Sequence, residues 1–371
     1  MIYIHIPFCK QACHYCNFHF STSMKYKDEV LNAILHEIEL QKNYLSSQTI
    51  KSIYFGGGTP SLLTADEIKR IFSKLAQFYT IEKDVEITLE ANPDDLTPSK
   101  IKDFASTPIN RFSIGIQSFH DVDLKYMNRA HNAEEAQKCV KYAQDNGFSN
   151  ITVDLIYGTP TMNNDRWHEN IQTTFDLGVP HVSCYALTVE PNTALDHFVK
   201  KKKMPPVDEE QSAQQFEILI AEMEKNGFDH YEISNFAQPD HYAKHNSNYW
   251  KGVSYLGLGP SAHSFNGQSR QWNIAHNMKY IKAINSDQIP FEIEHLSTDD
   301  LYNEYVMTGL RTIWGMDLAR IEAFGARYKK SFLKTIQPFL DNGIALQNET
   351  HYMLSKQGKL MADGVASALF I

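Results

Sequence analysis

The sequence predicts an α/β protein in which a parallel β-sheet is followed by a small, mainly helical unit. Up to about Ala186, short β-type runs alternate with amphipathic helical segments, a pattern typical of βα units. From about His295, helical segments and two short apolar runs follow one another, which predicts a winged-helix-like appendage. Glycine-rich and polar residues come directly after successive strands. This placement favours closure of the sheet into a partial barrel with a site at its carboxyl end.

Each expected element has a local signal. The six expected strands are Ile2–Ile6, Ser52–Phe55, Glu86–Glu90, Arg111–Ile116, Thr152–Ile156 and Val182–Ala186. The helices between them are Val30–Leu40, Asp66–Phe78, Ala133–Asn146 and Arg166–Leu177. Thr64 and Glu67 form a capping box ahead of the second helix, and Gly147 and Gly178 mark helix ends. In the last part we expect helices at Asp299–Leu310, Leu318–Phe324 and Lys330–Asn342, followed by the run Ile344–Leu346 and a turn into Tyr352–Leu354.

Three regions are therefore expected. Residues 1–235 form the barrel, residues 236–294 a connecting segment, and residues 295–371 the C-terminal domain. Within the first region, the run Lys200–Lys203 indicates a solvated connector, followed by a helix that opens at Asp208–Glu210.

The composition excludes several classes of partner. The chain has 371 residues, of which 42% are hydrophobic, enough for a substantial core. Its 35 basic against 44 acidic residues give a net charge of −9, so no overall basic field attracts nucleic acid or anionic lipid. No run approaches the roughly 18 apolar residues of a membrane span, and the first residues lack the features of a secretion signal. We expect a cytoplasmic protein that binds no nucleic acid and is not an integral membrane protein.

Three of the five cysteines lie close together near the N-terminus. Cys9, Cys13 and Cys16 follow a C-x3-C-x2-C spacing, and thiolates favour iron–sulfur clusters, zinc or copper(I). A three-cysteine loop leaves one iron of a [4Fe–4S] cluster open to a ligand from outside the protein. Structural zinc takes four protein ligands instead.

Other residues leave an alternative open at this loop. His5, His14 or His19 could supply the fourth ligand of a zinc site. By contrast, Cys139 in a helical segment and Cys184 in a strand are predicted to be small buried hydrophobes.

The segment from Tyr3 to Cys9, with the cysteine spacing, resembles the radical S-adenosylmethionine (SAM) superfamily. The matching branch contains oxygen-independent coproporphyrinogen III dehydrogenase. The resemblance implies a barrel of the radical SAM kind, a [4Fe–4S] cluster on the three cysteines, and SAM at its open iron. The residues that match the SAM pocket of that branch are Tyr3, Tyr15, Gly57, Gly58, Thr59, Glu90, Gln117, Arg129, Asp154 and Ala186.

These residue types suit the implied ligand. Glycines let the backbone approach a ligand closely. Glu90 offers an acceptor for ribose hydroxyls, and Arg129 could bind the SAM carboxylate by charge-assisted hydrogen bonds. No residue is assigned a catalytic role.

Two departures from the dehydrogenase pattern favour the related HemW family of haem chaperones. Phe18 stands where the dehydrogenases have a fourth cysteine, and Cys9 lies almost at the N-terminus, without their N-terminal extension. The run His245–Trp250 also resembles the H-N-x-x-Y-W signature of HemW, which is associated with haem binding. It implies His245 as an axial haem ligand, and His263 is the second candidate.

The main hypothesis is a haem chaperone that binds haem and transfers it to an acceptor protein, with a [4Fe–4S] cluster and SAM as cofactors. It implies an electron donor for the cluster, and contact with membrane-bound haem proteins only at the membrane surface. The scaffold could cleave SAM, but coproporphyrinogen oxidation is not expected. Oxidative decarboxylation of coproporphyrinogen III and a zinc-stabilised binding module are the alternatives.

Overall fold

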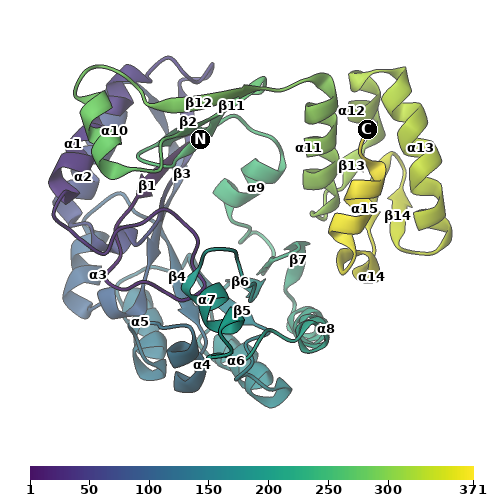
Figure 1. The fold of residues 1–371 in the computed structure, drawn as a ribbon, viewed down its shortest axis with the longest axis horizontal. Coiled ribbons are helices and arrows are strands. Elements are labelled where there is room, and N and C mark those ends of the chain that lie inside the picture. The colour runs from purple at the N-terminus through teal and green to yellow at the C-terminus, as the bar shows by residue number, and fades with distance from the viewer.

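The computed structural model describes all 371 residues and is built around one nine-stranded sheet. The sheet has the strand order β7-β8-β6-β5-β4-β3-β2-β1-β9 (Figure 1). The predicted strands run parallel in chain order as β1 (Ile2–Ile6), β2 (Thr49–Gly57), β3 (Thr80–Ala91), β4 (Arg111–Gln117), β5 (Ile151–Tyr157) and β6 (His181–Ala186). The two edge strands do not pair with each other, so the sheet stays open. The predicted partial barrel is confirmed.

Short strands from later in the chain extend this sheet at both edges. β9 (Leu256–Leu258) pairs in parallel with β1. At the other edge, β8 (Asn235–Ala237) pairs antiparallel with β6, and β7 (Asp229–Glu232) pairs antiparallel with β8. The boundary predicted between residues 235 and 236 falls inside β8. The barrel sheet therefore includes residues on both sides of that boundary.

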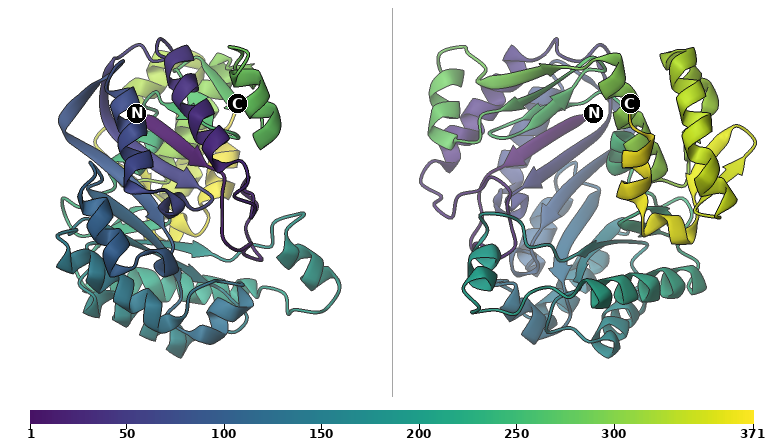
Figure 2. Two further views of the ribbon diagram at one scale, coloured as in Figure 1. Left: turned by 90° about the vertical axis from the view of Figure 1, so that its left-hand side faces the viewer. Right: turned by 45° about the vertical axis from the view of Figure 1, so that its right-hand side comes forward.

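Helices cover the outer face of the sheet (Figure 2). They are α1 (Lys27–Leu40), α2 (Ala65–Leu75), α3 (Pro98–Ala105), α4 (Asp121–Tyr126), α5 (Ala133–Asp145), α6 (Asn164–Asp176) and α8 (Glu209–Lys225). The short α7 (Ala194–Lys200) instead packs against the segment after β1, where the Leu195 backbone donates to the His14 carbonyl. The capping box of Thr64 and Glu67 opens α2 as predicted. Gly147 and Gly178 adopt positive φ after α5 and α6, which confirms both predicted helix ends.

The two faces of the parallel strands differ in chemistry, because side chains alternate along a strand. Outward-facing residues such as Phe55, Leu89 and Val153 pack into the main hydrophobic core under the helices. Inward-facing residues are mostly polar, and Glu90 and Asp154 are examples. The concave side of the half-barrel is therefore a polar interior.

The segment after the barrel adds a small sheet and two helices. Its elements are α9 (Lys244–Trp250), β10 (His263–Phe265), β11 (Ser269–Asn273), α10 (Asn277–Ile284) and the edge strand β12 (Phe291–His295). None of these elements was predicted. They are short, so their hydrophobic periodicity spans too few residues to stand out.

The last part of the chain forms a separate unit with its own hydrophobic core. It contains α11 (Thr298–Leu310), β13 (Met316–Asp317), α12 (Leu318–Phe324), α13 (Ala326–Asp341), β14 (Ala345–Asn348), β15 (His351–Leu354), α14 (Lys356–Lys359) and α15 (Ala362–Leu369). The three predicted helices are present, and the two runs that follow them overlap with β14 and β15. Backbone hydrogen bonds from Ile313 to Tyr231 (3.0 Å) and from Ile233 to Arg311 (3.1 Å) join this unit to the edge of the barrel.

No helix of the structure has the length and apolar character that a membrane crossing requires.

A buried carboxyl group ties the small sheet to the barrel. Glu37 of α1 has no exposed surface. Its oxygens accept hydrogen bonds from the Gly259 backbone (2.7 Å), the Tyr280 hydroxyl (2.6 Å), the Asn273 amide (2.6 Å) and the Gln41 amide (3.1 Å). Burial raises the pKa of this carboxyl group above its ordinary value. Four donors from different elements thus depend on one acceptor.

We expect the substitution Glu37→Ala to lower the free energy of unfolding of the barrel by about 3 kcal/mol, because several buried donors lose their acceptor. Denaturant unfolding followed by far-ultraviolet circular dichroism measures this loss. Glu29, exposed on the same helix, is the matched control, and Glu29→Ala should change stability by less than about 0.5 kcal/mol. Equal effects of the two substitutions would contradict the structural role of Glu37.

Candidate functional site

A cavity of about 450 Å³ lies at the carboxyl ends of the parallel strands. Its walls come from the loop after β1, from the ends of β2 to β6 and from α9. Most residues predicted for the site line it, namely Cys9, Cys13, Tyr15, Cys16, Gly57, Gly58, Thr59, Glu90, Gln117, Arg129, Asp154 and Ala186. Residues far apart in sequence are brought together here because parallel strands end at the same edge.

The three cysteines lie on a loop that is closed at its base. The Cys9 backbone donates to Ser21 (3.0 Å), and the Ser21 backbone donates to Pro7 (2.9 Å). Farther along, the Asn128 side chain donates to the Ala12 carbonyl (2.7 Å). The loop is therefore pinned both to β1 and to the segment after α4.

His5 holds the same loop from behind. Its Nε2 atom lies 2.9 Å from the His19 carbonyl oxygen, and its Nδ1 atom lies 3.1 Å from the Tyr3 hydroxyl. Burial lowers the pKa of His5 to about 4, so the ring is neutral at pH 7. The carbonyl can only accept, so Nε2 carries the proton and Nδ1 accepts from Tyr3.

This arrangement also places Tyr3 outside the cavity. Tyr3 was predicted to contact SAM, but its ring stacks on Tyr54 with centroids 6.1 Å apart, and it does not line the cavity. Its contact with His5 instead connects it to the cysteine loop. Tyr3 thus lies behind the residues that line the cavity and supports them through its contacts with His5 and Tyr54.

The glycines at the end of β2 are required because another part of the protein's own chain lies close to them. A Cβ atom on Gly58 would come within 2.6 Å of the Phe8 carbonyl oxygen, and one on Gly57 within 2.7 Å of the His5 ring. Gly57 also has φ of +108°, which side chains rarely adopt. These residues therefore let the cysteine loop pack on β2, in addition to leaving a bare backbone at the cavity.

The donor set fits a cluster. Cys9, Cys13 and Cys16 all line one cavity, yet no three His, Cys, Asp or Glu side chains converge on a single metal position. Ligands of a cluster bind different irons, so they do not need to converge on one point. Burial raises the pKa of the Cys9 thiol to about 11, which means that binding of iron must displace its proton.

Arg129 connects the cysteine loop to the strands. Its guanidinium donates to the Cys13 Sγ atom (3.2 Å), to the Asn92 side-chain oxygen (2.7 Å) and to the Gly115 carbonyl (2.6 Å). Its Nε atom is buried and has no partner. The cavity thus contains a positive charge directly beside a predicted cluster ligand.

Two carboxyl groups are recessed in the same cavity. Glu90 accepts hydrogen bonds from the Tyr54 hydroxyl (2.8 Å) and the Gly57 backbone (3.2 Å). Asp154 accepts from the Ser113 hydroxyl at 3.2 Å. Burial raises the pKa of Glu90 to about 7 and that of Asp154 to about 6. A hydrogen-bond donor or a positive charge bound beside them would therefore favour the ionised form of each group.

His245 has a different environment from the one expected of an iron ligand. The ring lies 1% exposed, with Nδ1 2.9 Å from the Ser52 hydroxyl and Nε2 3.1 Å from the Tyr249 hydroxyl. Glu86 accepts hydrogen bonds from the backbones of Lys244 (2.9 Å) and His245 (2.8 Å) at the start of α9. In this conformation neither ring nitrogen of His245 is available to a haem iron.

Some cavity residues were not predicted. Asn246 of α9 and Asn92 after β3 line the cavity, as do Tyr185 and Phe18, whose side chains are 44% and 66% exposed. Tyr185 could have been found from strand alternation, because it lies two residues after the inward-facing Ser183. Asn246 belongs to the H-N-x-x-Y-W run, but that run was interpreted as a haem signature and was not predicted to reach this cavity.

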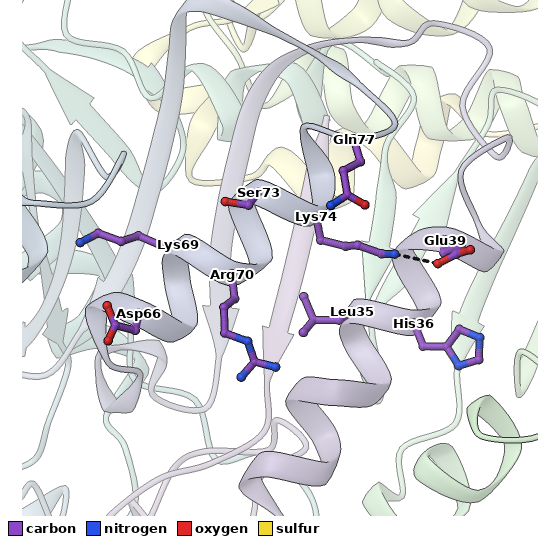
Figure 3. A pocket seen from close by; sticks show the side chains of 9 residues that line it. All are labelled: Leu35, His36, Glu39, Asp66, Lys69, Arg70, Ser73, Lys74 and Gln77. Atoms are coloured by element: carbon purple, nitrogen blue, oxygen red, sulfur yellow. Dashed lines mark hydrogen bonds and ion pairs between the residues drawn. The ribbon is translucent and has the colours of Figure 1, made fainter.

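A second hollow lies on the outer surface between α1 and α2, away from the cysteine loop (Figure 3). It is open and lined mainly by charged side chains. Lys74 and Glu39 form an ion pair across it (2.7 Å), and Arg70 donates to Asn32 (2.9 Å). None of its nine lining residues was predicted for the site, so it is a weaker candidate than the barrel cavity.

Comparison with known proteins agrees with this geometry. The family model described as "Radical SAM superfamily" matches residues 3–174, and that described as "HemN C-terminal domain" matches residues 296–361. The solved structure of Escherichia coli coproporphyrinogen III oxidase (HemN), a radical SAM enzyme, has a TM-score of 0.86 at 22% identity, covering 100% of this chain and 89% of that one. The fold and the cysteine site thus define a protein of the radical SAM class.

Curated relatives make the assignment more specific. "Heme chaperone HemW" of Bacillus subtilis (strain 168) is 33% identical over 370 residues, which cover 99% of this chain and 98% of that protein. "Heme chaperone HemW" of Escherichia coli (strain K12) is 33% identical over 267 residues, 71% of this chain and 69% of that protein. The chain belongs to the HemW family. Membership of the radical SAM superfamily implies a [4Fe–4S] cluster and SAM.

The raised pKa of Glu90 leads to a pH-dependent prediction. Between its ordinary value of 4.5 and about 7, the unfolded chain releases this proton first, so stability falls as the pH rises through that window. Glu90→Gln removes this penalty. We expect the free energy of unfolding of the variant, relative to the unsubstituted protein, to increase by about 1–2 kcal/mol between pH 5 and pH 8.

Urea unfolding of the protein without cluster or SAM, at several pH values, measures this difference. Glu217→Gln, at an exposed position of α8, is the control and should leave the pH dependence unchanged. A Glu90→Gln curve parallel to that of the unsubstituted protein would show that the carboxyl group is not desolvated.

Proposed function

We propose that this protein is a cytoplasmic haem chaperone, which binds haem and transfers it to an acceptor protein. The cavity that places three cysteines, two recessed carboxyl groups and an arginine around one space is the observation that carries the cofactor part of this proposal. The names of its full-length relatives support the haem part. Further components are an electron donor for the cluster, surface contact with membrane-bound haem proteins, and no role for nucleic acid.

Within the cavity, Cys9, Cys13 and Cys16 would hold a [4Fe–4S] cluster, and SAM would occupy the space beside them. When bound, these groups supply one-electron chemistry. Arg129 would keep negative charge at Cys13 favourable through its hydrogen bond to Sγ. It would also offer its unpartnered Nε–H to the SAM carboxylate.

The carboxyl groups would position the rest of SAM. Glu90 would accept hydrogen bonds from ribose hydroxyls, because its oxygens line the cavity and are already ordered by Tyr54 and Gly57. Asp154, held by Ser113, would face the positively charged sulfonium side of the ligand. Gln117 adopts φ of +67° at the end of β4, a strained conformation that brings this residue to the cavity wall.

One alternative function has an observation in its favour. The fold matches that of coproporphyrinogen III oxidase over this whole chain, so oxidative decarboxylation of coproporphyrinogen III is the second candidate. Against it, Phe18 stands at the cavity, where the dehydrogenase pattern has a fourth cysteine.

The cluster assignment can be tested by anaerobic reconstitution with iron and sulfide. We expect the unsubstituted protein to bind about four irons and four sulfides per chain, and Cys9→Ala, Cys13→Ala and Cys16→Ala each to lose most of them. Cys139→Ala, at a buried position in α5, is the control and should retain the cluster. Zinc bound in place of iron and sulfide would support the zinc-stabilised module instead.

The haem function can be tested with the reconstituted protein. We expect titration with ferric haem to shift the Soret band with a saturable 1:1 end point, and the loaded protein to pass haem to an apo-cytochrome in solution. The absence of any Soret change would overturn the proposal. Accumulation of protoporphyrinogen during anaerobic incubation with coproporphyrinogen III and SAM would favour the second candidate.

A further inference from the structure

The lysine run that begins at the end of α7 has no role in the chemistry of the cavity. Lys200, Lys201, Lys202 and Lys203 are all exposed. Lys200 pairs with Asp196 one turn earlier (2.8 Å), but the other three side chains form no ion pair or hydrogen bond within the protein. In a chain with a net charge of −9, three consecutive residues thus carry unpaired positive charges on the surface.

The lysine run is held against the cysteine loop on its N-terminal side. The Leu195 backbone donates to the His14 carbonyl (2.8 Å), and His14 directly follows Cys13. The rings of Phe198 and His14 meet edge to face, with centroids 5.1 Å apart. The Lys203 backbone donates to the Phe198 carbonyl (2.8 Å), so the run folds back onto α7. Figure 1 shows α7 next to the purple N-terminal segment.

The C-terminal side of the run is tied to the same loop. The Tyr126 hydroxyl donates to the Pro205 carbonyl (3.1 Å), and the Tyr126 carbonyl accepts from Nδ1 of His14 (2.9 Å). Met204 and Tyr15 pack against one small hydrophobic cluster. The lysines therefore lie between two fixed points, and the fold sets their position beside the cysteine loop.

The character of this surface fits a weak and transient protein partner. Lysine is a flexible, strongly hydrated point charge and is depleted from the cores of stable interfaces. Opposite charges on two proteins instead accelerate their encounter. Electron-transfer complexes bury little surface and must separate after each transfer. A carrier that reduces a cluster on the cysteine loop has to approach that loop, and the lysine run is a positively charged surface fixed beside it.

An anionic membrane fits the lysine run less well. Segments that bind at a membrane surface combine basic residues with apolar side chains that enter the lipid. Phe198, Val199 and Met204 are only partly exposed, since they pack toward the cysteine loop and its neighbours. The run therefore offers charge without an apolar anchor.

We propose that the run Lys200–Lys203 is the docking surface for an acidic one-electron carrier protein that reduces the cluster. This inference rests on the proposed function and specifies the electron donor that it requires. In the transfer, the carrier loses one electron and the cluster gains it. No bond forms or breaks, and no proton moves.

The first test measures binding of flavodoxin, an acidic one-electron carrier, to the full-length, reconstituted protein by surface plasmon resonance. We expect the double substitution Lys201→Glu and Lys203→Glu to weaken affinity at low salt at least about tenfold, because two attractions become repulsions. Binding to the unsubstituted protein should weaken as salt rises to about 0.15 M, where charges are screened beyond about 8 Å. Lys330→Glu with Lys334→Glu makes the same change of charge at exposed positions of α13. This control should bind like the unsubstituted protein.

The second test measures the rate of cluster reduction by stopped-flow absorption. The double substitution Lys201→Glu and Lys203→Glu should slow reduction by reduced flavodoxin at least about tenfold. It should not change reduction by photoreduced 5-deazariboflavin, which is small and uncharged. Equal slowing with both reductants would overturn the assignment, because the lysines would then act on the cluster site itself.

The outcomes separate this inference from the proposed function. If the unsubstituted protein holds the cluster and the Lys201→Glu and Lys203→Glu variant binds flavodoxin as well as the α13 control does, the docking surface is wrong while the cluster assignment stands. If the variant instead loses binding only to vesicles of phosphatidylglycerol and phosphatidylethanolamine, the run faces a membrane and the inference is wrong. If the unsubstituted protein takes up no cluster, the cofactor part of the proposed function fails, and this inference fails with it.

Discussion

The polar interior of the half-barrel is the constraint on which the rest of the structure depends. A parallel sheet covered by helices on one face alone leaves the other face to be filled, and here that face carries charged and hydroxyl side chains. Each of them must find a partner, because an unpaired polar group in this environment costs free energy. Arg111, 1% exposed, donates to Thr88 and Thr152 and lies 3.9 Å from Glu86. Glu86 in turn receives the amino end of α9.

The same constraint explains why α9 lies where it does. Its backbone N–H groups satisfy Glu86, its His245 ring satisfies Ser52, and its Asn246 side chain reaches the cavity. On the opposite side, the Trp250 ring lies 5.5 Å from the Arg311 guanidinium of the C-terminal unit. One short helix therefore connects strands β2 and β3, the cavity and the C-terminal unit. Figure 1 shows α9 between the barrel and the C-terminal unit.

The parallel strands, the outer helices and most of the cavity were predictable because their signals are local. Strand alternation, capping residues and the cysteine spacing each lie within a few residues of sequence. The environment of His245 was not predictable, since its partners Ser52 and Glu86 lie 193 and 159 residues away. A motif can indicate a ligand, but the partners of its ring nitrogens depend on tertiary packing. The surroundings of Tyr3 were not predictable for a related reason: its strand was predicted, but its side chain lies behind the glycine segment, next to His5.

The anchors of the cysteine loop come from widely separated parts of the chain. Its base closes at Ser21, but it packs on Gly58, and it is held by Asn128 through Ala12 and by the Leu195 backbone, which donates to the His14 carbonyl at 2.8 Å. During synthesis the cysteines leave the ribosome first, while the last of these anchors follows nearly two hundred residues later. The loop can reach its final shape only when most of the barrel has been translated. Assembly of a cluster on the three cysteines would thus be a step that follows folding of the barrel.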